Sequence, residues 1–258
     1  MNMSEEEGSV FSRSDGPIVL ITLNRPEKRN ALNDEMISSL KNLLRQANDA
    51  PLTRVIVITG AGRDFCSGAD LSALQKIADG SVSENVDDAR SLMELFILIR
   101  QLRVPVVAAV RGKALAGGCG LASACDLILA SSDASFGYPE VKIGFVPAMV
   151  MAMLRRNVSE KRAFELITLG KEITADEALK LGLVNQVFRP EYFDGGMFHY
   201  AREFEQMSKS AVALTKSLFY QMDGMSFGSA LETGVDVNVI ARLTEDCQKG
   251  IAKFLKKE

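Results

Sequence analysis

A single histidine occurs in the 258 residues, and this scarcity limits the chemistry available to the chain. A Ser-His-Asp hydrolase would have to use His199, which lies in the charged stretch FHYAREFEQ, and the sequence has no G-x-S-x-G elbow. We therefore expect His199 to be a solvated helix residue. A Walker lysine is also missing, and GAGRDFCSG (60–68) lacks the third glycine of a dinucleotide-binding fingerprint.

Cysteines are few as well. The four of them, Cys66, Cys119, Cys125 and Cys247, have neither the spacing of a zinc site nor the density of a disulfide framework. They predict reduced, mostly buried thiols. We expect no metal site.

Long apolar runs and an excess of positive charge are also absent. VPVVAAV and VPAMVMAML are far shorter than the roughly 18 to 20 residues that span a bilayer. A net charge of -3 gives no broad positive field, so we expect neither nucleic acid nor a membrane as a partner. The acidic start, MNMSEEEGSVFSRSDG, lacks the features of a signal or transit peptide. We predict a flexible leader over residues 1–15 and a cytoplasmic protein.

What the sequence does contain is an alternation of apolar strands and amphipathic helices. The strands are expected at 18–24, 54–60, 104–112 and 126–131, and the helices at 33–49 and about 86–102. After Pro147 the pattern is almost entirely helical, apart from a strand-like segment at 183–188. Near-continuous apolar strands separated by helices predict a stacked α/β core followed by a helical tail.

Two glycine-rich turns each follow a predicted buried strand: CSGADL (66–71) and ALAGGCGLASACDL (114–127). Their small residues leave backbone N–H groups uncovered, and at a helix start the unpaired donors and the dipole favour negative charge. Two such donors aimed at one point form an oxyanion hole. The alternative is that these glycines only permit tight packing of helix against strand.

Four segments in register closely resemble the enoyl-CoA hydratase/isomerase, or crotonase, family. They are RPEKRNAL (25–32), FCSGADL (65–71), ALAGGCGLASACDL and FGYPEVKIGFVP (136–147), and the resemblance runs from about Ile18 to the end of the chain. It implies an α/β fold with a crotonase-like spiral of repeated strand-strand-helix units over 16–190 and a C-terminal helical trimerisation region over 191–258. It also implies acyl-CoA thioester substrates, a homotrimer or hexamer, and no cofactor beyond the coenzyme A that enters with the substrate.

The resemblance also implies roles for individual residues. The backbone N–H groups of Ala69 and Gly117 would form the oxyanion hole around the thioester oxygen. Residues expected to contact CoA are Lys28 and Arg29 at the phosphates, Ser67, Ala69, Asp70 and Leu71 at the adenine and pantetheine, and Phe254 and Lys257 on the last helix, in many relatives from a neighbouring subunit.

The acid/base residues depart from the pattern of typical hydratases in this family. Those enzymes have two glutamates, and here the first position is Gly120 while the second is Glu140. One carboxylate can move a proton between two carbons, as in single-glutamate isomerases of the family. Hydration would need another group to hold the water, and Glu94 on the long helix is a candidate. A glutamate introduced at position 120 would lie one helical turn from the hole and point toward the reacting carbons, unless another side chain already fills that space.

Two further departures concern the segment after Glu140. Hydrolases and dienoyl isomerases of the family often carry an aspartate where this chain has Ala148, so both of these activities lose support. Met149, Met151 and Met153 lie near the expected acyl pocket, and flexible methionines suit an apolar acyl group, although plain core packing would explain at least two of them.

These observations favour an enzyme that acts on enoyl-CoA through Glu140, by hydration and dehydration or by double-bond isomerisation. Burial beside apolar neighbours would raise the pKa of Glu140 toward neutrality, which suits a group that must give and take a proton. The alternatives are an acyl-CoA-binding protein without turnover and an acyl-CoA hydrolase of the same family. Retention of Glu140 favours the enzyme.

Overall fold

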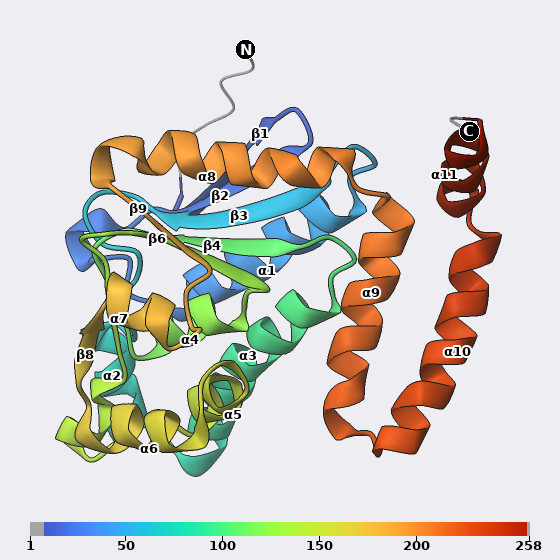
Figure 1. The fold of residues 1–258 in the computed structure, drawn as a ribbon. Helices are drawn as coiled ribbons and strands as arrows, with labels where there is room; N and C mark the ends of the chain where they lie inside the picture. Colours follow the sequence, from blue (N-terminus) through green and yellow to red (C-terminus); the bar gives the residue numbers. More distant parts are fainter. Residues whose placement is uncertain (1–7, 257–258) are drawn as a thin grey trace.

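The apolar segments pair into a six-stranded sheet within residues 8–256, the part of the chain that this computed structural model describes. The strand order is β1-β2-β3-β4-β6-β9, with β1 antiparallel to β2 and the other pairs parallel (Figure 1). The strands are β1 (Val10–Asp15), β2 (Ile18–Leu23), β3 (Val55–Gly60), β4 (Val106–Val110), β6 (Leu127–Ser131) and β9 (Gln186–Phe188). Every residue of β2 and β4 is buried, which explains their continuous apolar sequences.

The predicted flexible leader is wrong for residues 10–15, because they form the edge strand β1. Val10 pairs with Leu23 and Asp15 with Ile18. Only Val10 of this strand is buried, so hydropathy gives little sign of it. Residues 1–7 of the predicted leader lie outside the described part of the chain.

A smaller sheet lies beside the first, with the order β5-β7-β8. Its strands are β5 (Lys113–Leu115), β7 (Ser135–Gly137) and β8 (Glu172–Thr174). The chain runs from β4 to β5 and into helix α4 (Gly117–Ala124), and then from β6 to β7 and into the short 3-10 helix η2 (Pro139–Ile143). This repetition of strand, strand and helix confirms the predicted spiral.

The long helices of the first half begin at clear capping residues. The side chain of Asn33 accepts a hydrogen bond from the N–H of Met36 at the start of α1. Ser81 and Glu84 form a capping box at the start of α3, so this helix begins earlier than the sequence analysis expected. The helices and turns of this half are η1 (Pro26–Lys28), α1 (Asp34–Asp49), α2 (Leu71–Asp79) and α3 (Val82–Gln101).

Helix α8 (Phe193–Arg202) belongs to the core, which corrects the predicted boundary at residue 190. Its side chains Phe193, Met197 and Ala201 are buried in a cluster with residues of β2, β3 and β4. Figure 1 shows α8 lying across the sheet, away from α1 and α4. The α/β core therefore continues beyond residue 190. As predicted, His199 is on this helix and is exposed.

The remaining helices divide into a group near α4 and a C-terminal group. They are α5 (Ala148–Asn157), α6 (Glu160–Leu169), α7 (Ala175–Lys180), η3 (Pro190–Tyr192), η4 (Glu203–Gln206), α9 (Lys209–Gln221), η5 (Met222–Gly224), α10 (Phe227–Leu243) and α11 (Glu245–Leu255). Lys216 anchors α9 to the core, since its buried ammonium donates to the carbonyls of Ile99 and Val104 and pairs with Asp126 at 2.7 Å. Helices α10 and α11, which lie wholly in the described part, contain no buried residue.

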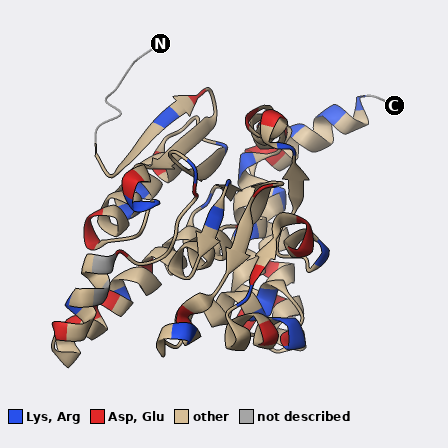
Figure 2. Ribbon diagram, turned by 90° about the vertical axis from the view of Figure 1, so that its left-hand side faces the viewer, with Lys and Arg blue, Asp and Glu red and all other residues tan. Residues whose placement is uncertain are grey.

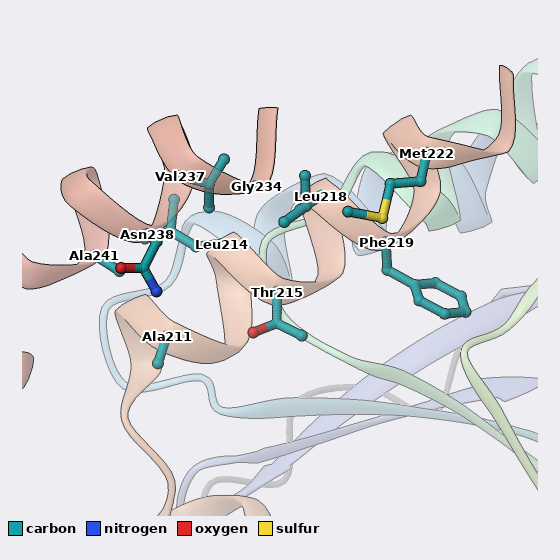
Figure 3. Close-up of a pocket in the computed structure, with 10 residues that line it drawn as sticks. All are labelled: Ala211, Leu214, Thr215, Leu218, Phe219, Met222, Gly234, Val237, Asn238 and Ala241. Atoms are coloured by element: carbon teal, nitrogen blue, oxygen red, sulfur yellow. The ribbon is translucent and has the colours of Figure 1, made fainter. Parts of the chain in front are cut away.

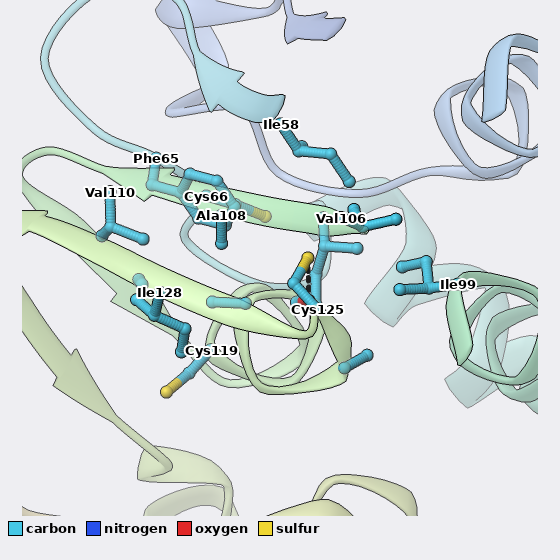
Figure 4. Packing of buried hydrophobic residues seen from close by; sticks show 14 of the residues in the cluster. Ile58, Phe65, Cys66, Ile99, Val106, Ala108, Val110, Cys119, Cys125 and Ile128 are labelled. Carbon is cyan, nitrogen blue, oxygen red and sulfur yellow. Dashed lines mark hydrogen bonds between the residues drawn. The ribbon is translucent and has the colours of Figure 1, made fainter. Parts of the chain in front are cut away.

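The core and the surface differ in composition as expected for a globular protein. Figure 4 shows Cys66, Cys119 and Cys125 among the aliphatic side chains between the sheet and α4, and all three thiols are free and buried. In Figure 2, positive and negative residues alternate along the outer helices.

No helix within residues 8–256 is long and apolar enough to cross a membrane. In the same residues, no three His, Cys, Asp or Glu side chains are grouped as a metal site.

Candidate active site

The start of helix α4 leaves the N–H of Gly117 exposed to the site. Ala116, just before it, has a φ of 49° and a ψ of -125°, an uncommon conformation for a residue other than glycine. Its N–H donates to the carbonyl of Gly137 at 2.8 Å, which holds the turn. The first N–H groups of a helix have no partner within the helix and need an acceptor from outside it. Within the described residues, the N–H of Gly117 has no such acceptor.

A second N–H is presented by the turn at Ala69. The N–H of Leu32 donates to the carbonyl of Gly68 at 2.7 Å, and the carbonyl of Leu32 accepts from the N–H of Asp70 at 3.1 Å. Because peptide groups alternate in direction along extended chain, the N–H of Ala69 between these bonds faces away from Leu32. No acceptor for it is found in residues 8–256.

The two turns are in direct contact. Gly68 has a φ of 100°, and a Cβ atom there would lie 2.9 Å from Cβ of Ala116 and 3.6 Å from the N atom of Gly117. A Cβ atom at Gly118 would overlap with the carbonyl of Cys66. The glycines therefore allow backbone to approach backbone, as the packing interpretation holds, and the same approach brings Ala69 and Gly117 to one place.

Sheet pairing places Glu140 at the same edge. Leu115 at the end of β5 pairs with Gly137 at the end of β7, and both strands are parallel. The chain reaches Gly117 two residues after the first strand and Glu140 three residues after the second. Glu140 is half-buried, and its Oε2 atom is buried with no hydrogen-bond partner among the described residues. Loss of hydration raises the pKa of this carboxyl, as predicted.

Polar side chains that the sequence analysis did not select lie beneath this edge. The hydroxyl of Tyr138 is 2.9 Å from Oγ of Ser123, and both residues are buried. Burial also raises the pKa of the Cys119 thiol to about 12, so this cysteine is a neutral packing group. A tyrosine directly after β7 and before Pro139 was the available signal.

The space beside Gly120 is filled. A Cβ atom at this position would overlap with Cγ1 of Val150 on α5 and lie 3.2 Å from Cζ of Phe96 on α3. Both of these side chains are buried. Of the two outcomes foreseen for a glutamate at position 120, the structure bears out the second, because side chains of α5 and α3 already fill the space.

Glu94 does not replace the missing carboxylate. Its Oε2 atom lies 3.0 Å from the ammonium of Lys41 on α1, and the Glu94 side chain is 56% exposed. This ion pair holds α3 to α1. Glu94 is therefore not the group that holds the water in place of the glutamate missing at position 120.

The loop predicted to bind CoA phosphates lies next to the Ala69 turn. Lys28 and Arg29 are exposed at the end of η1, and the carbonyl of Arg29 accepts a hydrogen bond from the N–H of Ser67 at 3.1 Å. Two exposed cations and Ser67 are thus brought together on one side of the site.

Asp70 is turned inward, and its carboxylate has protein partners. Oδ1 accepts from the N–H of Ser72 at 3.0 Å and caps α2, while Oδ2 pairs with Arg25 at 2.6 Å. The N–H of Ser72 and the guanidinium of Arg25 lower the pKa of Asp70. A contact of Asp70 with CoA would therefore involve its backbone. Leu71, the next residue, begins α2.

Phe254 is not brought to this site within one chain. It lies on α11, is 68% exposed, and its helix packs on α9 and α10 (Figure 1). Lys257 lies outside the described residues. The methionines of α5 are mainly core residues, since Met153 is buried and Met149 and Met151 are partly buried against the core.

The sequence model of the family described as enoyl-CoA hydratase/isomerase matches residues 13–258. The chain belongs to this family. As a member of the enoyl-CoA hydratase/isomerase family it is an enzyme with the crotonase fold. A Thermus thermophilus protein with the provisional name enoyl-CoA hydratase is 39% identical over 242 residues, covering 94% of this chain and 96% of its own. The enoyl-CoA hydratase domain-containing protein 3, mitochondrial, of Danio rerio is 33% identical, covering 100% of this chain and 89% of its own.

Solved structures of the enoyl-CoA hydratase/isomerase family have the same fold. The crystal structure of enoyl-CoA hydratase from Mycobacterium smegmatis superimposes with a TM-score of 0.93 and 30% identity, covering 98% of both chains. The agreement over nearly the whole length includes the C-terminal helices.

Proposed function

We propose that the protein shifts the double bond of enoyl-CoA thioesters, with Glu140 as the acid/base and the N–H groups of Ala69 and Gly117 as the oxyanion hole. The observation that carries this proposal is the buried Oε2 atom of Glu140, which has no partner in residues 8–256. A buried carboxylate oxygen without a partner is costly, and a bound substrate that offers a proton would supply the partner.

The chemistry follows from one carboxylate and two donors. Glu140 removes a proton from the α carbon of a β,γ-unsaturated acyl-CoA, and the electron pair moves into the thioester as a dienolate. Ala69 and Gly117 donate hydrogen bonds to the oxygen on which the charge develops. Glu140 then returns the proton to the γ carbon, which leaves an α,β-unsaturated product. The raised pKa of Glu140 suits both steps.

The CoA part of the substrate would lie along the loop beside the Ala69 turn. Lys28 and Arg29 are exposed cations suited to phosphates, and Ser67 adjoins them through its bond to Arg29. The backbone at Asp70 and Leu71 continues this surface. We propose no cofactor beyond the coenzyme A of the substrate.

Hydration is the second candidate, and the names of the relatives favour it, since the Mycobacterium protein is called an enoyl-CoA hydratase and the Thermus protein carries the same name provisionally. Adding water requires a group that holds it opposite Glu140. Val150 and Phe96 fill the space beside Gly120, and Glu94 is paired with Lys41. The geometry therefore supports isomerisation better.

We also propose that the C-terminal helices assemble the chain into a homotrimer, or into a hexamer of two trimers. Exposed apolar side chains follow α10: Phe227, Leu231, Val235, Val239, Ile240 and Leu243. An apolar groove between α9 and α10 adds to this surface, and its lining includes Leu214, Leu218 and Val237 (Figure 3). Exposed apolar surface of this extent indicates an interface. Phe254 and Lys257 would then contact the CoA of a neighbouring subunit.

The cytoplasmic location stays a prediction, and the Danio relative is named as mitochondrial.

Product analysis with a matched pair of substrates tests the reaction. The purified enzyme is incubated separately with a β,γ- and an α,β-unsaturated acyl-CoA of one chain length, and the products are separated by liquid chromatography and mass spectrometry. We expect each isomer to yield the other. A water adduct as the main product would establish hydration instead, free CoA would indicate the hydrolase, and saturable binding with no product would indicate a binding protein.

A further inference from the structure

Arg25, two residues after the end of β2, makes two side-chain contacts that converge on the Ala69 turn. One guanidinium nitrogen pairs with Oδ2 of Asp70 at 2.6 Å, and the other donates to the carbonyl of Ala31 at 2.9 Å. The side chains are only 18% exposed for Arg25 and 7% for Asp70. Such charge-assisted bonds, shielded from water, are stronger than those of an exposed ion pair.

Asn30 fixes the loop that carries Arg25. It is fully buried, and its side-chain oxygen accepts from the N–H of Arg25 at 2.9 Å. Its amide nitrogen donates to the carbonyls of Ala61 at 2.9 Å and Asp64 at 2.7 Å. The guanidinium therefore extends from a loop that is itself held to the chain after β3.

The two contacts of Arg25 fall on either side of the bonds that orient Ala69. Ala31 directly precedes Leu32, which accepts from the N–H of Asp70 and donates to Gly68. Asp70 directly follows Ala69. Ala69 itself is exposed, so no packing of its own side chain fixes the direction of its N–H.

We propose that Arg25 is a positioning residue, which aims the N–H of Ala69 at the thioester oxygen by joining the Ala31 carbonyl to the Asp70 carboxylate. This inference rests on the proposed function of Ala69 as a hole donor. Donors of an oxyanion hole act by being fixed before charge develops, so a small loss of alignment lowers turnover more than it lowers binding. The planar guanidinium suits this role because its donors lie on separate nitrogens in fixed, different directions, whereas the donors of a lysine all lie on one rotating ammonium.

The test compares Arg25→Ala and Arg25→Lys with Arg103→Ala. Arg103 forms an exposed ion pair with Asp49 at 3.0 Å, with no contact to the Ala69 turn, and so serves as the matched control. For each folded variant, kcat, KM and the affinity for free CoA are measured. The spectrum of bound acetoacetyl-CoA, whose enolate absorbs in the near ultraviolet, reports how well the hole stabilises negative charge.

We expect Arg25→Ala to lower kcat by about 10- to 100-fold, with KM and CoA affinity within about threefold of the parent, because a misplaced group costs up to roughly 100-fold. The enolate signal should fall in parallel, and millimolar guanidinium should restore part of both. Arg25→Lys should lie between Ala and the parent, and Arg103→Ala should match the parent. If Arg25→Ala does not fold, the kcat and the enolate signal of Arg25→Lys, compared with those of the parent, test the inference alone.

Unchanged kcat and enolate signal in the folded Arg25 variants would overturn the inference, and so would an equal loss in Arg103→Ala. A parent enzyme that binds acetoacetyl-CoA without any enolate signal, and that turns over no enoyl-CoA, would instead overturn the proposed function. The two failures are therefore distinguishable.

Discussion

Helices α4 and α10 differ in how much of their apolar surface is buried. In α4 seven of the eight residues are buried, and all but one of these side chains are no larger than that of cysteine. In α10, which the structure describes throughout, none of the 17 residues is buried, although large apolar side chains such as Leu231 and Val235 line it. The comparison teaches that small residues in α4 let neighbouring backbone and side chains approach closely, whereas the large exposed ones on α10 form the surface that the proposed trimer would cover.

The largest effect is expected from Glu140→Gln, which removes the proposed acid/base. Turnover should fall by about 100- to 10,000-fold, the usual contribution of such a group. Glu94→Gln is the control, since that carboxylate is mostly exposed and paired with Lys41. Rates on a β,γ-unsaturated acyl-CoA provide the measurement, and retention of the parent rate by folded Glu140→Gln contradicts the assignment.

Glu140 should also affect the pH dependence of stability. Burial raises its folded pKa above the ordinary value of 4.5, so its contribution is fully present below the unfolded pKa. That contribution is lost as the pH rises through the folded pKa, because the folded state then holds an ionised carboxylate with reduced hydration. Thermal melts across this range should show that the decline is smaller in Glu140→Gln than in the parent.

The second largest effect is expected from Gly117→Pro, which removes one donor from the start of α4. A lost hole donor lowers kcat by about 100- to 1,000-fold. Gly117→Ala keeps the N–H and has room, because its Cβ atom would lie 3.8 Å from Leu32 and 4.0 Å from Leu92. The Gly117→Ala variant should stay folded, and its kcat should fall less than that of Gly117→Pro. Equal kcat in the parent and the folded proline variant argues against Gly117 as a donor.

A moderate effect on stability is expected at Gly120. Gly120→Ala places a Cβ atom against Val150, and overpacking of this kind costs about 1–3 kcal/mol. For a chain of this size that lowers Tm by roughly 2–4 °C per kcal/mol. Adding Val150→Ala should recover part of the loss. Gly195→Ala on α8 is the control, because no atom lies within 4 Å of its added Cβ. A parent-like Tm for Gly120→Ala would show that α5 can move away, and a glutamate at position 120 would then become feasible.

The smallest effect on the single chain is expected from Leu231→Ser on α10. Its side chain is 57% exposed, so the free energy of unfolding of one chain should change by less than about 0.5 kcal/mol. Assembly should nevertheless weaken, because an apolar contact would be lost at each interface. Light scattering after size-exclusion chromatography measures the mass. A mass for the parent equal to that of one chain would contradict the proposed trimer.

Local signals in the sequence predict the parts of the fold that local chemistry dictates. The spacing of apolar residues and the Asn33 cap predict α1, and continuous apolar runs predict β2, β3 and β4. The family motifs predict that the turns at Ala69 and Gly117 meet, and the structure brings them into contact. These elements depend on neighbours in the chain or on motifs already known.

The remainder depends on contacts between distant segments, which a single sequence does not reveal. Polar β1 is held by backbone pairing with β2, and α8 is part of the core because it covers the second face of the sheet. Val150 closes the space beside Gly120 through packing of α5 on α4. Asp70 turns inward because Arg25, 45 residues earlier, pairs with it.

The cysteines give the enzyme a selective attachment point. Burial raises the pKa of Cys66 and Cys119 to about 12 and that of Cys125 still further, so these three thiols are shielded from electrophiles and almost entirely protonated. Cys247, near the start of α11, is partly exposed. A maleimide dye would therefore attach to one position, on helix α11. Energy transfer between dyes on different copies would then report on assembly of the proposed trimer in real time, without any substitution in the chain.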